Sequence, residues 1–160
     1  MALRNIVREG DPILGKKCRP VTEITDRTRE LIDDMIETLR DSGGIGLAAP
    51  QVGILRRIVV IELDGVLYEL INPEFVETEG DQFELEACLS VPDLMGRVHR
   101  PARVKVRAMD RNGEMHEYEG TELLARAFCH ELDHLDGILY TSKAVEVFDH
   151  DPEEDENEEE

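Results

Sequence analysis

The stretch TELLARAFCHELDHL, from Thr121 to Leu135, is apolar on most of its circumference when it is drawn as a helix. Thr121 is a candidate N-cap, and Gly137 suits the turn that follows the C-terminal end. A helix that is apolar on nearly every side is normally buried. We therefore expect a buried central helix from about Thr121 to Leu135.

This helix would carry the pattern H-E-x-x-H at His130, Glu131 and His134. Two histidines four residues apart project from one helix face, where they can bind one metal ion, and the adjacent glutamate can act as a general base. The alternative is a chance spacing. Three polar groups on a buried helix are costly unless they are paired, so we predict a metal site.

The rest of the chain predicts several short strands and one further helix. Asp64-Gly65 and the stretch 110–113 are typical of hairpin turns, and Asn72-Pro73 is expected to break the chain. The expected elements are a helix over 26–41, extended segments over 57–63, 66–71, 74–79, 83–86, 104–108 and 115–119, and a strand or short helix within 140–148. The fold class is therefore α+β, with short antiparallel sheets packed around the central helix that carries the H-E-x-x-H motif.

Length and charge indicate one domain with an acidic extension. The 160 residues are 41% hydrophobic, enough for one core, and we assign residues 1–148 to a single domain. Residues 149–160 hold nine of the 37 acidic side chains and no basic one, which predicts a disordered acidic tail. The net charge of −19 argues against DNA and anionic membranes as partners, although it leaves room for a local basic patch.

The sequence also favours a cytoplasmic protein. Its N-terminus has no apolar stretch of signal-peptide length, and the apolar run around 58–61 is far too short to span a bilayer. Cys18, Cys88 and Cys129 are an odd number of cysteines. In a reducing compartment they are expected to be thiols or a metal thiolate rather than disulfides.

A loop of small residues, GGIGLAAPQ, occupies positions 43–51. Its G-x-G-x-x-A match to a dinucleotide-binding fingerprint is spurious, because a helix precedes it where a strand is required and Pro50 interrupts the phosphate-binding helix. From the chemistry of its residues alone, two interpretations of this loop are equally supported. The loop is a tight connection, or its backbone approaches a ligand while the Gln51 amide polarises a carbonyl group.

The chemistry of the residues alone does not decide which side chain is the third metal ligand. The extended zincin spacing requires histidine at position 140, where this chain has Tyr140, so that class is excluded. A downstream carboxylate such as Glu146 is one candidate. Cys88 is another, and the alternative for Cys88 is a small buried apolar residue.

Three motifs together resemble those of peptide deformylases, the enzymes that remove formyl from the initiator methionine of new bacterial and organellar polypeptides. GIGLAAPQ at 44–51, EACLS at 86–90 and HELDH at 130–134 occur in the order of that family, and the likeness extends from about Arg4 to Val147. The third motif alone is shared with proteases, but the combination of three is not.

The resemblance implies that Cys88 joins His130 and His134 in holding one divalent metal ion. Fe²⁺ is the ion favoured in the family, with Zn²⁺, Ni²⁺ or Co²⁺ as substitutes, and a Cys-His-His set suits iron and zinc alike. Glu131 would take a proton from water and deliver it to the leaving amine. The Gln51 amide and the Leu89 backbone N–H would stabilise the oxyanion.

The resemblance also implies how the substrate binds. N-formylmethionyl nascent peptides would pair, in the manner of a strand, with Ile45, Gly46 and Ala87. The methionine side chain would enter a pocket that includes Ile45, Met95 and Leu123. A transient contact with the ribosome would bring the enzyme to its substrate, although the acidic tail would be repelled by RNA.

Two residues depart from the family pattern. Ala87 stands where the family usually has glycine, and Cys129, which we expect to pack in the core, stands where it usually has glutamine. If position 87 needed a positive φ, alanine would be strained by about 1 kcal/mol or more; otherwise its methyl group narrows the substrate groove. The alternative functions are therefore a formyl-peptide-binding protein without turnover and a metallopeptidase that cuts short peptides.

Overall fold

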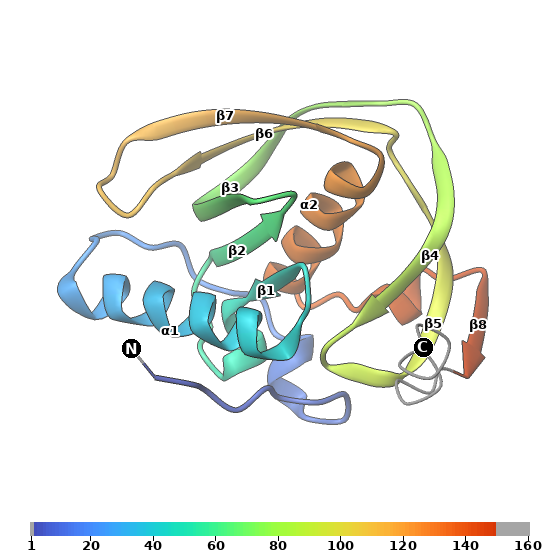
Figure 1. Cartoon of the computed structure of the whole chain (residues 1–160), viewed down its shortest axis with the longest axis horizontal. Helices are drawn as coiled ribbons and strands as arrows, with labels where there is room; N and C mark the ends of the chain where they lie inside the picture. The colour runs from blue at the N-terminus through green and yellow to red at the C-terminus, as the bar shows by residue number, and fades with distance from the viewer. Residues whose placement is uncertain (1, 150–160) are drawn as a thin grey trace.

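The computed structural model describes residues 2–149 and has an α+β architecture with antiparallel sheets, as the sequence predicts. Two helices lie among eight strands within these residues (Figure 1). The helices are α1 (Asp26–Ser42) and α2 (Glu122–Leu135), and short 3₁₀ turns are η1 (Pro12–Gly15), η2 (Ala49–Val52) and η3 (Tyr140–Ser142). The strands are β1 (Gly46–Ala48), β2 (Ile58–Leu63), β3 (Val66–Glu79), β4 (Gln82–Cys88), β5 (Val91–Arg100), β6 (Arg103–Met109), β7 (Met115–Thr121) and β8 (Glu146–Asp149).

The strands form two separate sheets. The larger sheet has the order β1-β2-β3-β6-β7, and the smaller has the order β4-β5-β8. All of their pairings are antiparallel. Residues alternate between the two faces of a strand, so each sheet offers one apolar face to the interior.

Helix α2 contacts both sheets, lying against β1, β2, β6 and β7 of the larger one and against β5 of the smaller one. Figure 1 shows it in the middle of the molecule, with β4, β5 and β8 on one side. Its buried residues extend from Ala125 to its C-terminal end and include Phe128, Leu132 and Leu135. Thr121 occupies the N-cap position, but its side chain makes no capping hydrogen bond.

Helix α1 covers the other face of the larger sheet at β1 and β2. It begins with a capping box, in which the Thr25 side chain accepts from the Thr28 N–H and Thr28 accepts from the Thr25 N–H. It ends at Gly43, whose φ of 74° permits a left-handed C-cap. Its apolar face packs into a second core cluster with Leu47 and Ile58.

The expected break at Asn72-Pro73 is wrong, because β3 runs through it. Asn72 adopts a φ of 51°, and the β3–β6 register shifts between Ile71 and Glu74. The Asn72 side chain accepts from the Val21 N–H and donates to the Val21 carbonyl, each at 2.8 Å. A bulge therefore accommodates the proline without ending the strand.

Other differences concern the segments around the smaller sheet. The stretch 91–100, for which the sequence predicts no element, is the long strand β5, and the segment after α2 contains both a 3₁₀ turn and a strand. Asp149, assigned to the acidic tail from the sequence, is the last residue of β8, whereas the rest of that predicted tail lies outside the described residues. Within residues 2–149, no helix combines the length and the apolar character needed to cross a membrane.

Candidate active site

Three side chains from two elements meet in a buried cluster. Cys88 ends β4, and His130 and His134 are one turn apart on α2. One ligand atom from each lies within 4.8 Å of the others, and Cys88 Sγ is 3.4 Å from His134 Nε2. Ligand atoms around a tetrahedral metal ion are separated by about 3.5 Å, so the cluster has the spacing and the donor set of a metal site.

The pKa values of the two buried histidines are shifted in opposite directions. It lowers the pKa of His134 well below its ordinary value, so this ring is neutral and able to ligate a cation. Burial alone would also lower the pKa of His130, but the neighbouring Cys88 and Glu86 side chains raise it to about 10. His130 therefore lies where a positive charge is stabilised, and a bound metal ion would satisfy the same neighbours as a proton.

Glu131 is buried beside this cluster with an unusual protonation equilibrium. Only 4% of the residue is exposed, and burial raises the pKa of its carboxyl group to about 7. Within the described residues, its Oε1 atom has no hydrogen-bond partner. A carboxylate that titrates near neutral pH and keeps one oxygen available is suited to move a proton.

Gln51 contributes an oriented amide group. Its Oε1 accepts the Ala48 N–H at 2.9 Å, so its NH₂ group is turned toward Ser90 Oγ, 3.1 Å away, and Cys88 Sγ, 3.7 Å away. The small-residue loop thus forms β1 and η2, and η2 carries this amide into the site. The ligand-approach interpretation of the loop agrees with this position.

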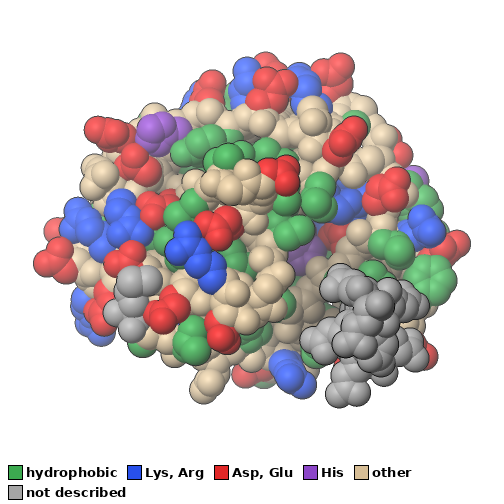
Figure 2. Space-filling model, viewed as in Figure 1, with side chains coloured by type: hydrophobic (Ala, Val, Ile, Leu, Met, Phe, Trp, Pro, Cys, Tyr) green, Lys and Arg blue, Asp and Glu red, His purple; other side chains and the backbone are tan. Residues whose placement is uncertain are grey.

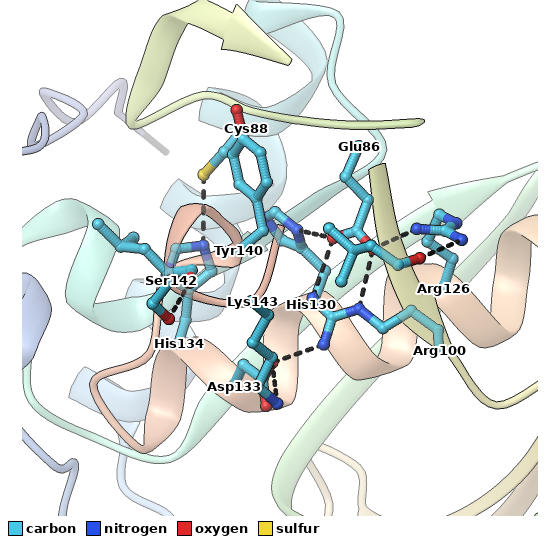
Figure 3. A network of polar contacts seen from close by, with 12 residues as sticks. Glu86, Cys88, Arg100, Arg126, His130, Asp133, His134, Tyr140, Ser142 and Lys143 are labelled. Carbon is cyan, nitrogen blue, oxygen red and sulfur yellow. Dashed lines mark hydrogen bonds and ion pairs between the residues drawn. The ribbon is translucent and has the colours of Figure 1, made fainter. Parts of the chain in front are cut away.

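Glu86 is the centre of a buried polar network that connects three elements (Figure 3). Its Oε1 lies 2.8 Å from His130 Nδ1, Arg100 of β5 donates to both of its oxygens at 2.8 and 3.0 Å, and Arg126 of α2 donates to Oε2. Burial would raise the pKa of Glu86, but the bonds from Arg100 and His130 outweigh it and lower this pKa to about 2. The ionised carboxylate orients the His130 ring by holding Nδ1, which leaves Nε2 for a metal ion.

Tyr140 closes the site on the side of η3. Its ring stacks on His130 with the centroids 5.8 Å apart, and its hydroxyl donates to the Leu94 carbonyl at 3.0 Å. Tyr140 and Glu86 both contact His130, and neither is among the site residues predicted from the sequence. The position of Glu86 could have been predicted from the sequence, because it precedes Cys88 by two residues in a strand and therefore faces the same side of the sheet.

A cleft of about 540 Å³ leads to this cluster and gathers nearly all of the predicted site residues. Hydrophobic side chains border the hollow in the middle of the face drawn in Figure 2, and histidine is visible inside it. The predicted residues that line the cleft are Ile45, Gly46, Gln51, Ala87, Cys88, Leu89, Met95, Leu123, His130 and Glu131, and His134 lies beneath them. The alternative ligand Glu146 is instead exposed on β8, 3.4 Å from Arg97.

Ala87 has ordinary extended backbone. The described non-glycine residues with positive φ are Asp64, Asn72 and Glu122, so the strain considered for an alanine at position 87 is absent. Cys129, the second departure, is 5% exposed and belongs to the main core cluster. Burial raises its thiol pKa to about 11, as expected for a packing residue.

A buried Cys-His-His cluster beside a carboxylate, at the end of a cleft between two sheets, is an arrangement typical of metal-dependent hydrolases. The family model of polypeptide deformylase matches residues 3–148. The chain belongs to the polypeptide deformylase family, and it is a metal-dependent enzyme that removes the N-formyl group from newly made polypeptides.

Individual relatives agree over most of the chain. The chain is 54% identical to a peptide deformylase of Acetivibrio thermocellus, over 94% of this chain and 89% of the relative. The crystal structure of peptide deformylase from Thermotoga maritima superimposes with a TM-score of 0.88 at 37% identity, covering 91% of this chain and 100% of the other. A peptide deformylase from Synechococcus elongatus, crystallised in complex with actinonin, has a TM-score of 0.86 at 38% identity and covers 89% of this chain and 79% of its own.

Proposed function

We propose that Cys88, His130 and His134 hold one divalent metal ion, and that Glu131 is the proton-transfer group of the deformylation reaction. The observation that carries this proposal is the buried triad itself, three potential ligand atoms within 4.8 Å of one another beside an almost fully buried carboxyl group. Fe²⁺ is our choice for the native ion, with Zn²⁺, Ni²⁺ or Co²⁺ as substitutes. When bound, such an ion supplies a Lewis acid and lowers the pKa of water.

The residues around the triad supply proton transfer and stabilisation of the oxyanion. Glu131 takes the proton from the attacking water and returns it to the nitrogen of the leaving amine, so that formate and a free N-terminus are produced. The Gln51 NH₂ group and the Leu89 N–H donate hydrogen bonds to the negative charge that develops on the formyl oxygen. The oriented amide of Gln51 supports this role, because its own oxygen is engaged by Ala48.

Substrate binding follows from the two strand ends that border the cleft. The backbone of an N-formylmethionyl peptide pairs with Gly46 at the start of β1, with Ile45 just before it, and with Ala87 of the edge strand β4. The methionine side chain enters the part of the cleft near Ile45, Met95 and Leu123. We place this reaction in the cytoplasm, with at most a transient ribosome contact.

The binding-only alternative rested on Ala87 either straining the turn that positions Cys88 or narrowing the substrate groove. The backbone at Ala87 is unstrained, so only the effect of one methyl group on the groove remains. A metallopeptidase that cuts short peptides is disfavoured by membership of the deformylase family. Turnover is therefore the function that we propose for this site.

Metal content of purified variants tests the ligand assignment. Cys88→Ser replaces a thiolate by a hydroxyl, a much poorer ligand for Fe²⁺ or Zn²⁺, so this variant should lose most of its metal during dialysis against a chelator. Cys129→Ser is the matched control, since Cys129 is equally buried beside His130 but belongs to the core cluster. Full metal retention by Cys88→Ser would remove Cys88 from the ligand set.

A further inference from the structure

The substrate cleft has a neighbouring hollow that the proposed reaction does not use. This second hollow has a volume of about 360 Å³. Leu85, Leu123 and Arg126 line both spaces, and beyond them the second hollow is bordered by Gln82, Glu84, Ala102 and Glu122. Three side chains therefore form a partition between the two spaces.

Arg126 is the fixed part of this partition. Its Nη1 donates to Glu86, its Nη2 to the Val98 carbonyl at 3.1 Å and its Nε to Gln82 Oε1 at 3.3 Å. Only 4% of Arg126 is exposed. A buried arginine with every guanidinium nitrogen engaged is strongly held in place, because any displacement would leave buried charges unpaired.

Leu85 and Leu123 are the two side chains of the partition that can be shortened by mutation. They come from β4 and from the first turn of α2, and they are 40% and 47% exposed. Substitutions at such exposed positions normally change stability little. Shortening either leucine should therefore enlarge the pocket without unfolding the protein.

We propose that the Leu85–Leu123 pair sets the maximum length of the N-terminal side chain that the enzyme accepts, by closing the substrate pocket against the second hollow. The ligand class that would occupy the joined space is a formyl peptide whose first residue carries an unbranched side chain longer than that of methionine. This inference rests on the proposed placement of the methionine side chain near Leu123. It adds a length limit that the placement alone does not imply.

The size of the effect follows from apolar burial. Each additional methylene group that leaves water strengthens binding by about four-fold. Removing the partition should therefore strengthen the binding of a peptide with a long first side chain by on the order of ten-fold, relative to the binding of the methionine peptide. This gain requires that two or more extra methylene groups enter the second hollow. Methionine itself should bind slightly less well, because it loses contact with the removed leucine.

The experiment compares two formyl tripeptides that differ only in the first side chain, methionine or an unbranched alkyl chain twice as long. The specificity ratio, kcat/KM for the long chain divided by kcat/KM for methionine, is measured in the metal-loaded wild type, Leu123→Ala and Leu85→Ala. Leu3→Ala is the matched control, because Leu3 is 55% exposed and lies outside both hollows. The ratio should rise by about ten-fold or more in Leu123→Ala or Leu85→Ala and stay unchanged in Leu3→Ala.

Binding of the same peptides in a Glu131→Gln background gives a second readout that does not depend on turnover. If the leucine variants bind the long-chain peptide more tightly, relative to the methionine peptide, than the wild-type pocket does, the length limit is supported. This result would not depend on the catalytic roles proposed above. Ratios within two-fold of wild type in both leucine variants, by turnover and by binding, would overturn the inference. An equal shift in Leu3→Ala would do the same.

Discussion

Ala87 is the residue at which the sequence raised a doubt about catalysis. It lies in β4 directly before Cys88, and the β4–β5 register shifts between these two residues. Its backbone needs no glycine, and its methyl group is exposed at the cleft. The consequence of the alanine is therefore confined to the space available to the substrate strand.

We predict that Ala87→Gly changes KM for formyl-methionyl peptides by no more than about five-fold, equivalent to about 1 kcal/mol, and leaves metal content unchanged. One methyl group at the groove alters substrate contact, whereas the ligands and Glu131 keep their positions. Steady-state kinetics and metal analysis check this expectation. A thousand-fold rise in turnover would mean that the alanine had disabled the site.

How far the site could be predicted depends on the distance along the chain between its members. His130, Glu131 and His134 follow from helical spacing alone, since a helix places them within one turn. Cys88 required a resemblance, because no local rule brings β4 to α2. The partners of Glu86 come from β5 and α2, and their convergence is a property of packing that no single segment encodes.

At the scale of elements, the close approach of β1 to α2 positions Glu131. A Cβ atom built on Gly46 would lie only 2.5 Å from Glu131 Oε2 and 2.8 Å from its Cγ. The carboxyl group therefore packs directly against the Gly46 backbone. Glycine is needed here for space, since its φ is not positive.

We predict that Gly46→Ala displaces the Glu131 carboxyl group and lowers turnover by about a hundred-fold, a loss typical of a misplacement of about 1 Å at a catalytic group. Metal content should be retained, because the three atoms nearest to the added Cβ all belong to Glu131, which is not one of the proposed ligands. Gly15→Ala is the control, since a Cβ there meets nothing within 4 Å. Turnover of Gly46→Ala equal to that of Gly15→Ala would show that the contact does not constrain Glu131.

The predicted elements were accurate where periodicity is strong and wrong where side chains alter the backbone. The helix predicted over 26–41 and the hairpin at Asp64-Gly65 lie where their local signals indicate. The continuous strand through Asn72-Pro73 depends on hydrogen bonds to Val21, fifty-one residues away in sequence. Such a distant partner is invisible to a local rule for proline.

At the scale of the whole molecule, negative charge is concentrated at the C-terminal end of the sequence. Residues 150–160 contain eight of the 37 acidic side chains and no apolar residue, and they lie outside the described residues. The body, in contrast, pairs acidic and basic side chains across the exposed faces of β3, β6 and β7, as with Arg103 and Glu119 at 2.9 Å. Figure 2 shows both signs of charge interspersed along the edge over β6 and β7.

We predict that truncation after Asp149 leaves both the fold and peptide turnover unchanged. The removed segment has no apolar side chain that could stabilise the core, and the cut preserves β8. The melting temperature should stay within about 2 °C of the full-length value. A larger loss would indicate that the segment is docked on the body.

The most direct test of the account is formate release from a formyl-methionyl peptide by iron-loaded protein under anaerobic conditions, in wild type and Glu131→Gln at equal metal content. The wild type should release formate, and Glu131→Gln should be slower by about 10²- to 10⁴-fold, because it retains the ion but has lost the group that moves the proton. Equal rates in the two proteins, or no formate from the wild type with iron, nickel or cobalt, would contradict it.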